Sequence, residues 1–477
     1  MTSTTRALDD RPPASGPGRL PNRALFAYGF LNLPLSIAGL PLVLYIAPFY
    51  ASDVGLALTA IGLVLMLGRI SDAFTDPLIG VLSDRWRSRW GRRKPWILIG
   101  TPLMMLATWM VFVPPAGVGW VYLLVWISVL YLGWTMVQIP YAAWGAELSP
   151  DYHERSRIAG SREVFQIIGL LIASSLPLIV AASVGQAPPA PGEAASLRPV
   201  MEVLAIAATV LLPLAAVLAV LFVPDRPAPL APARRVPFKR ALRVVVRNGP
   251  FMRLLIATLI GGVAASMNFN LAILFYTHAM QLPEAAGGLL FLYFVIGVMA
   301  LPLWIWLAKR VNKHRALCYA SLWGVGWFAT YPFLPPGDMT LMTVVTIATG
   351  MSMAAGPVLG ASIAADVVDL DTARGGAQRS AMFFAFWGMG SKFALAAGVG
   401  IALPALELLG FSAIGPNEPD AIFALVTFYC LVPIALWLVT ISILWNFPID
   451  QKRQKRLQDR IARRAAIAGN PLAENVH

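Results

Sequence analysis

Two aspartates, Asp72 and Asp76, lie one helical turn apart within a hydrophobic stretch that runs from residue 56 to residue 82. A carboxylate in hydrocarbon is costly unless it faces protein, water or a counter-ion, so a pair of them indicates a functional site. Residues four apart share one face of a helix, and Arg69 precedes Asp72 by three residues on that face. We therefore predict a cation site. The alternative is a structural cluster in which Arg69 neutralises one aspartate.

The ion could be Na⁺ or H⁺. Na⁺ is a hard cation that prefers oxygen ligands, and two carboxylates supply them. The same pair could instead hold a proton, because two close carboxylates in a low dielectric do not readily both ionise. The residue types leave both ions open.

Lys392 is the third costly charge, because it lies deep in another hydrophobic run close to Trp387. An unpaired ammonium is unfavourable there, so we expect Lys392 to pair with Asp72 or Asp76 and to compete with the cation. The alternative is a lysine that reaches the membrane interface. Lys392 follows Arg379 by 13 residues, more than half of a roughly 20-residue span, which disfavours that alternative.

The composition of the 477-residue chain is that of a membrane protein. Hydrophobic residues make up 58% and charged residues only 13%, whereas soluble domains carry roughly 25% charged residues. The net charge of +13 collects in short loops between apolar runs, which excludes a nucleic-acid-binding face. Cys318 and Cys430 lie in apolar runs and indicate neither a metal nor a disulfide framework. With no nucleotide-binding loop or hydrolase constellation, we expect no enzyme activity and no cofactor beyond the coupling ion.

Runs of about 20 apolar residues, the length that crosses a bilayer, occur twelve times along the chain. They lie near 24–50, 56–82, 95–114, 118–146, 162–184, 200–223, 250–280, 285–308, 315–335, 339–365, 378–405 and 420–447. The expected fold is therefore an all-α integral membrane protein with twelve transmembrane helices.

The spans divide into two six-helix halves, and each half has the same charge pattern. We predict an N-terminal half over 24–223, a cytoplasmic linker over 224–249 and a C-terminal half over 250–447. A disordered tail over 1–23 and a basic tail over 448–477 complete the chain. Bases collect in alternate loops, so both termini and the linker are expected on the cytoplasmic side of a plasma membrane, the inner membrane of a bacterium. The expected partners are lipid and a small solute, and the chain is expected to be a monomer.

Three segments resemble a known transporter family. Gly80 to Arg85 resembles the loop motif of the major facilitator superfamily, and the longer stretch 68–100 is similar to the melibiose permease-like glycoside–pentoside–hexuronide:cation symporters. Segments 139–155 and 365–392 resemble the same family in the right order. The resemblance implies two pseudo-symmetric halves and cation-coupled symport of a small organic solute, such as a sugar or glycoside, by alternating access.

The resemblance also implies roles for individual residues. It places Asp72, Asp76, Thr75 and Thr135 in the cation site, and Lys392 with Arg69 in coupling. The sugar half of the family pattern is absent, because the first span has no charge between Arg23 and Asp53 and the fourth has Gln138 in place of an acid. A uniporter or lysolipid transporter of the same fold, or a membrane sensor without transport activity, therefore remain alternatives.

Further residues are candidates for solute contact and for a gate. The candidate solute contacts are Gln138, Arg162, Trp134, Tyr45, Asn268 and Trp387. Aromatic residues and amides in such helices more often pack against other helices, so packing is the alternative for them. The candidate cytoplasmic gate comprises Asp84, Arg89, Arg92, Arg93, Asp366 and Asp369. The alternative is that these loop charges only set the topology.

Overall fold

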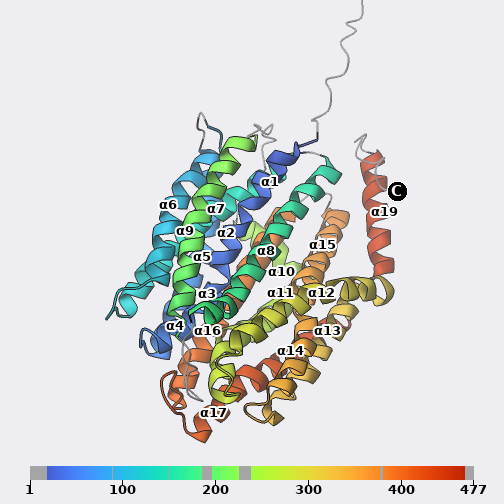
Figure 1. Cartoon of the computed structure of the whole chain (residues 1–477). Coiled ribbons are helices and arrows are strands. Elements are labelled where there is room, and N and C mark those ends of the chain that lie inside the picture. Colours follow the sequence, from blue (N-terminus) through green and yellow to red (C-terminus); the bar gives the residue numbers. More distant parts are fainter. Residues whose placement is uncertain are drawn as a thin grey trace, which may run out of the picture.

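A computed structural model describes residues 19–86, 88, 90–149, 151–184, 196–224, 238–375 and 380–467. Helices make up the regular structure of these residues (Figure 1). The first half contains α1 (Asn22–Phe30), α2 (Asn32–Gly39), α3 (Pro41–Leu44), α4 (Ile46–Ser52), α5 (Leu58–Arg85), α6 (Lys94–Phe112), α7 (Trp120–Glu147), α8 (Tyr152–Val184) and α9 (Arg198–Phe222).

After α10 (Phe238–Arg247), the second half follows. It contains α11 (Gly249–Leu274), η1 (Phe275–Ala279), α12 (Ala286–Val311), α13 (Lys313–Phe328), η2 (Tyr331–Phe333), α14 (Met339–Met353), α15 (Ala355–Gly375), α16 (Ser380–Leu408), α17 (Pro419–Val426), η3 (Thr427–Leu431), α18 (Val432–Trp445) and α19 (Gln451–Ile467). η1 and η3 are π-helical turns and η2 is a 3-10 turn.

Eleven helical segments of the described residues are long and apolar enough to cross a bilayer. The predicted ninth span is shorter, because α13 has 16 residues, but it packs among α12, α14 and α18 as a member of the second bundle. The predicted all-helical fold with two halves is confirmed.

The first span is not one continuous helix. It is interrupted at Leu31, Leu40 and Tyr45, which join α1 to α4. Prolines at 34, 41 and 48 explain the interruptions, because proline lacks a backbone N–H and its ring clashes with the carbonyl four residues earlier.

Several helices extend beyond the predicted apolar spans. α8 begins at Tyr152, ten residues before the predicted span 162–184, and its polar first turns contain an ion pair of 2.8 Å between Arg157 and Glu154. The predicted linker contains α10, and the predicted basic tail contains α19. Hydropathy reports only the part of a helix that lies in lipid, so these polar helical turns were not predicted.

The two ends of the bundle differ in how the halves meet. At the end where α5 and α12 begin, both halves share one buried core that includes Leu58 and Leu403. A Cβ on Gly62 of α5 would lie 2.8 Å from Pro404 Cδ of α16, so this close approach needs glycine. At the other end, where α1 begins, the second half has separate buried clusters around Val367 and Leu359. We call the first the closed end and the second, which carries the basic loops and α19, the basic end.

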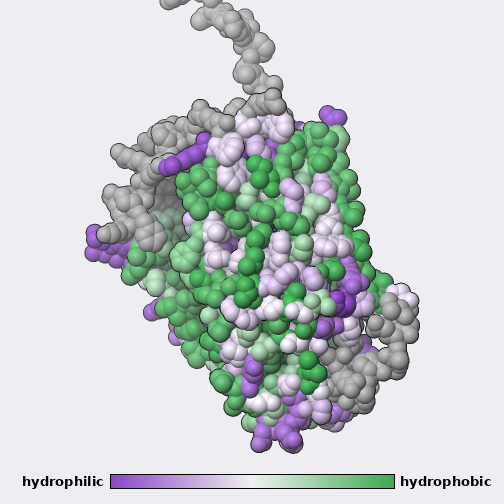
Figure 2. Space-filling model, turned by 90° about the vertical axis from the view of Figure 1, so that its left-hand side faces the viewer, coloured by the Kyte–Doolittle hydropathy of each residue, from purple (hydrophilic) through white to green (hydrophobic). Residues whose placement is uncertain are grey.

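The outer surface is apolar. Figure 2 shows hydrophobic residues over much of one side, and the strongly hydrophilic ones lie mainly toward its periphery. Leu221 and Met299, for example, are 69% and 70% exposed. Such a large apolar surface is expected for helices that face lipid.

Candidate cation and solute sites

The central cluster joins the two halves near the middle of α5. Thr135 of α7 donates from Oγ1 to Asp72 Oδ1 at 2.8 Å and to Asp76 Oδ1 at 2.9 Å. Lys392 of α16 lies on the other side, with Nζ 2.7 Å from Asp72 Oδ2 and 2.5 Å from Asp76 Oδ2. Lys392 was predicted to pair with Asp72 or Asp76, and in the structure it contacts both.

The charges and oxygens of this cluster suit a small cation. Asp72 and Thr135 are almost fully buried, and Asp76 and Lys392 are partly exposed. Two carboxylates face one ammonium, so one negative charge is left over if both carboxylates are ionised. Asp72 Oδ1, Asp76 Oδ1 and Thr135 Oγ1 meet at hydrogen-bond distance, and oxygens are the ligands that hard cations prefer.

The structure places Thr75 and Arg69 outside this cluster. Thr75 Oγ1 donates to the backbone oxygen of Asp72 at 3.2 Å, so its hydroxyl bonds to its own helix. The Arg69 guanidinium lies over the Tyr131 ring, 5.1 Å from its centroid. Within the described residues Arg69 forms no ion pair, and Lys392 is the base that contacts the aspartates. The alternative in which Arg69 neutralises an aspartate does not match this arrangement.

Arg69 instead lines a small pocket between the halves. Ser266 and Asn270 of α11 line the same pocket, together with Leu42 of the broken first span. Tyr131 lines it as well, and its buried hydroxyl has no hydrogen-bond partner in the described part of the chain. The pocket thus combines a guanidinium with neutral polar groups.

Three of the candidate solute contacts lie on two segments of the first half: Trp134 and Gln138 on α7, and Tyr45 in the first span. Trp134 packs so closely on α2 that a Cβ on Gly39 would lie 2.9 Å from its ring. Gln138 is half-buried, and Tyr45 is completely buried. Gln138 Oε1 and the Tyr45 hydroxyl both lack a hydrogen-bond partner among the described residues. Trp134 and Tyr45 therefore pack between helices, whereas the half-buried Gln138 has an acceptor, unpaired within this part of the chain, that a solute could use.

The other three candidates already have polar partners. Arg162 of α8 pairs with Glu163 at 2.8 Å, and its side chain is 30% exposed. Trp387 of α16 donates to Thr258 Oγ1 of α11 at 2.8 Å. Asn268 is buried and donates to the backbone oxygen of Tyr429, at a π-helical turn, at 3.4 Å. Solute contact for these residues stays a prediction.

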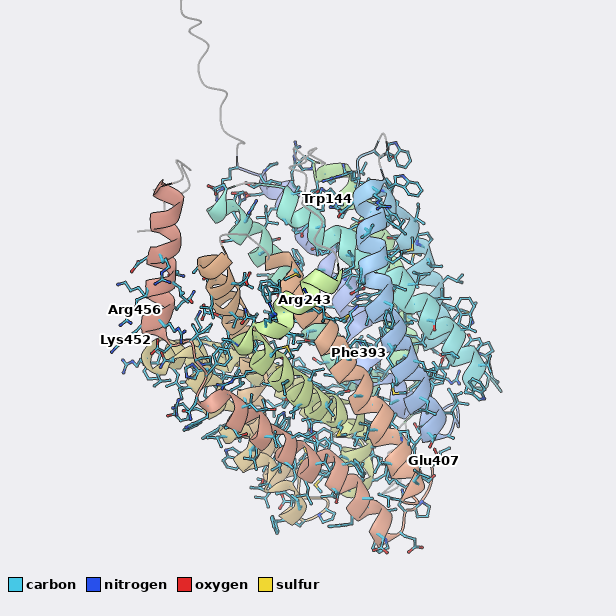
Figure 3. All side chains as sticks on the ribbon, turned by 180° about the vertical axis from the view of Figure 1, so that it is seen from behind. Trp144, Arg243, Phe393, Glu407, Lys452 and Arg456 are labelled. Atoms are coloured by element: carbon cyan, nitrogen blue, oxygen red, sulfur yellow. The ribbon has the colours of Figure 1, made fainter. Side chains whose placement is uncertain are left out.

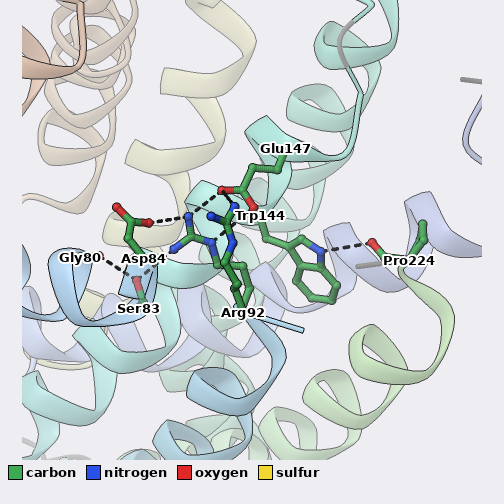
Figure 4. A network of polar contacts seen from close by, with 8 residues as sticks. Gly80, Ser83, Asp84, Arg92, Trp144, Glu147 and Pro224 are labelled. Atoms are coloured by element: carbon green, nitrogen blue, oxygen red, sulfur yellow. Dashed lines mark hydrogen bonds and ion pairs between the residues drawn. The ribbon is translucent and has the colours of Figure 1, made fainter. Parts of the chain in front are cut away.

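The predicted gate residues form one network in each half, and among the described residues no contact joins the two networks. In the first half (Figure 4), Arg93 Nη2 lies 2.7 Å from Asp84 Oδ1 and 2.6 Å from Glu147 Oε1, and Arg92 also contacts Glu147, at 3.0 Å. Burial opposes the charged form of Arg93, yet hydrogen bonds and charge from Glu147 and Asp84 raise its pKa above the usual value. Arg89 lies outside the described residues.

In the second half, Asp366 accepts from Lys313 Nζ at 2.7 Å, and Asp369 accepts from Gln454 of α19 at 2.5 Å. Between the described residues, polar contacts that cross from one half to the other occur in the central cluster and at the closed end. At the closed end, Glu407 of α16 accepts from the backbone N–H of Thr59 in α5 at 2.5 Å. The predicted gate would join the halves at the basic end, whereas in this structure the halves meet at the closed end. The gate therefore stays a prediction for another conformation.

The sequence reasoning did not identify Tyr131 or Glu407. Tyr131 precedes Thr135 by one helical turn, so its position next to the cation site was available as a signal. Glu407 was expected in a loop, whereas α16 continues to Leu408 and brings this acid to the first turn of α5 (Figure 3).

Curated relatives are transporters that match most of the chain. The mouse sodium-dependent lysophosphatidylcholine symporter 1 is 26% identical over 470 residues, covering 91% of this chain and 86% of that protein. An uncharacterized symporter from Synechocystis is 26% identical over 473 residues, covering 82% and 87%. The sphingosine-1-phosphate transporter MFSD2B of Xenopus tropicalis is 24% identical, covering 96% and 94%.

Solved structures share the fold. The nucleoside transporter NupG matches with a TM-score of 0.63 at 13% identity, covering 89% of this chain and 99% of that one. A bacterial homologue of the human lysosomal transporter Spinster, in an inward-facing conformation, matches with a TM-score of 0.64 at 13% identity, covering 93% and 99%. The MFS/sugar transport protein family model matches residues 27–451. The chain therefore belongs to this family and is a multi-pass membrane transporter of the symporter type, not an enzyme.

Proposed function

We propose that the protein is a Na⁺-coupled symporter of a lysophospholipid-like amphiphile, in which Asp72, Asp76 and Thr135 bind Na⁺. The observation that carries the coupling is the contact of Lys392 with both aspartates across the two halves. Na⁺ is favoured over H⁺ because curated relatives are named sodium-dependent symporters. This assignment is finer than the family, whose model also includes sugar carriers.

The coupling step is a competition for the same carboxylates. When Na⁺ binds to Asp72 and Asp76, it displaces the Lys392 ammonium and breaks an ion pair that joins α5 to α16. The freed ammonium then needs an anionic partner, which the headgroup phosphate of the amphiphile supplies. Na⁺ and cargo thus favour the same conformation, and a ligand shifts such an equilibrium only through its differential affinity for the two states.

The cargo is argued from the same region. Arg69 lines the small pocket between the halves and has no acidic partner among the described residues. The pocket of about 10 Å³ has room for one water, so Arg69 would meet a phosphate only after the halves move apart. Phe74 of α5 and Phe393 of α16 approach to 6.4 Å across the halves, and Phe74 is 65% exposed, so an acyl chain has apolar surface beside the charged cluster. A sugar is not favoured as the cargo. The first span of this chain has no charge between Arg23 and Asp53, and none of the relatives above is named as a sugar carrier.

Uptake into vesicles tests the proposal. Purified protein in proteoliposomes should accumulate radiolabelled lysophosphatidylcholine under an inward Na⁺ gradient, and should not do so under a K⁺ or pH gradient of the same size. Radiolabelled melibiose is the sugar control and should not accumulate. Accumulation of melibiose, or lysophosphatidylcholine uptake that ignores Na⁺, would reject the assignment.

We also propose that the basic end is cytoplasmic in a plasma membrane, so that this structure is inward-facing and the gate networks close in the opposite state. The concentration of bases at that end supports this orientation. Arg456→Cys and Glu418→Cys place thiols on exposed positions at the basic and closed ends. In intact cells, a membrane-impermeant maleimide should label only Glu418→Cys, since the native Cys318 and Cys430 are buried. Labelling of Arg456→Cys in intact cells would show that the basic end faces outward and would contradict the proposed orientation.

A further inference from the structure

A groove of about 380 Å³ lies at the basic end of the second half, away from the central cluster. It is formed by α12, α13, α15 and the start of α19, which lie together at the right of Figure 1. Its wall is mostly apolar, with Ile305 from α12 and Val358, Leu359 and Ile363 from α15. The volume is within the range of small-molecule sites.

The charged groups that line the groove differ in whether they have a partner among the described residues. Lys313 is held by Asp366, with Nζ 2.7 and 2.8 Å from the two carboxylate oxygens. Asp450 accepts from the backbone N–H of Arg453 at 2.7 Å and so begins α19. Lys309, by contrast, is exposed and has no ion pair within the described residues. A headgroup beside Lys309 would therefore meet an ammonium that has no carboxylate partner in this part of the structure, while the lining as a whole balances two lysines against two aspartates.

The basic helix α19 adds to this charge. Gln454 and Leu457 attach it to the second half, and its other face carries exposed bases, among them Lys452 and Arg456 (Figure 3). Asp459 is its one acid, against seven lysines and arginines. The surroundings of the groove therefore attract anions.

Aromatic residues close in sequence to groove-lining residues suggest that this end of the second half lies at the membrane surface. Trp306 is half exposed and lies under the Arg310 guanidinium, 4.4 Å from ring to charge. Arg315 covers Trp445 in the same way at 4.3 Å. Tryptophans with neighbouring bases are typical of the boundary between acyl chains and headgroups. A ligand with an apolar chain and an anionic head fits the apolar wall of the groove and the bases near it.

We propose that this groove binds one anionic phospholipid from the leaflet at the basic end. Its phosphate contacts Lys309, and one acyl chain lies along Ile305 and Val358. The bases of α19 raise the local concentration of such lipids, since each base near an anionic surface contributes to attraction. The site is separate from the cargo pathway, so it does not depend on the proposed function.

Native mass spectrometry of the whole protein tests this site. Delipidated protein is mixed with equal amounts of phosphatidylglycerol and phosphatidylcholine of the same chain length, and the lipid retained by each variant is measured. The wild type should retain one phosphatidylglycerol in preference to phosphatidylcholine. Lys309→Gln should reduce this retention about five-fold, as expected for the loss of one base near a headgroup.

Two further variants distinguish binding in the groove from nonspecific attraction of lipid to exposed bases. Val358→Trp fills the groove without changing charge and should abolish retention of phosphatidylglycerol. Arg85→Gln removes an exposed base from the first half and should leave retention unchanged. Equal retention of the two lipids, an equal effect of Lys309→Gln and Arg85→Gln, or full retention in Val358→Trp would each overturn the proposal. Lys309 is exposed, so its variant tests the proposal even if Val358→Trp does not fold.

Discussion

The central cluster and the Arg93 network contain similar groups but connect different parts of the molecule. Each combines two carboxylates with a buried or half-buried base: Asp72 and Asp76 with Lys392, and Asp84 and Glu147 with Arg93. The Arg93 network joins α5, α7 and the start of α6 within one half. The central cluster joins α5 to α16 in the other half. A charge cluster within one half stabilises that half, whereas one between halves can respond to their relative movement.

The largest expected effect is the loss of one carboxylate from the central cluster. Asp76→Asn should reduce Na⁺-driven accumulation by roughly 100-fold or more, because the remaining carboxylate of Asp72 is then fully paired with Lys392 and no excess negative charge is left to bind Na⁺. Uptake under a Na⁺ gradient in proteoliposomes measures this. Thr75→Val is the matched control on the same helix. It should keep near wild-type uptake because, within the described structure, the Thr75 hydroxyl donates to the backbone oxygen of Asp72 and to no carboxylate. If Asp76→Asn retained accumulation, the central cluster would not be the coupling site.

Lys392→Gln should separate ion binding from transport. Without the competing ammonium, the two carboxylates should bind Na⁺ about ten-fold more tightly, which corresponds to ~1.4 kcal/mol. Coupled uptake should fall at the same time, because the exchange between Na⁺ and the ammonium is lost. Thermal unfolding at a series of Na⁺ concentrations measures the affinity through the stabilisation by ligand. Lys392→Arg keeps the charge and is the control; weaker Na⁺ binding in Lys392→Gln would contradict the competition.

A change in the Arg93 network should lower the stability of the protein and leave its Na⁺ affinity unchanged. Glu147→Gln weakens contacts to both Arg92 and Arg93 and should lower the midpoint of thermal unfolding by about 2–5 °C. The Na⁺ concentration that gives half-maximal stabilisation should not change, since the network lies within one half. A change in Na⁺ affinity without a loss of stability would show that this network, too, takes part in coupling.

The sequence predicted the central cluster but not all of its surroundings. Asp72, Asp76 and Lys392 could be identified because charges in apolar spans are rare and costly, and Thr135 through the family resemblance. The Arg69–Tyr131 contact could not, because an aromatic residue on a spanning helix has the same pattern whether it packs in the core or meets a cation. The early start of α8 was missed for a related reason, since polar helical turns outside the bilayer resemble loops in hydropathy.

The smallest expected effect concerns the closed end, where Glu407 is the polar link between the halves in the described structure. Its carboxylate accepts from the N–H of Thr59 in the first turn of α5, a place where negative charge is favourable. Glu407→Gln should weaken this contact by about 1 kcal/mol and shift the population roughly five-fold toward opening at the closed end. Distances between spin labels on α5 and α16 at that end measure the shift. Glu418→Gln is the control, because that side chain is exposed at the same end and makes no hydrogen bond to the helix that follows it. An equal distribution of distances in both variants would show that apolar packing around Gly62 alone holds the closed end together.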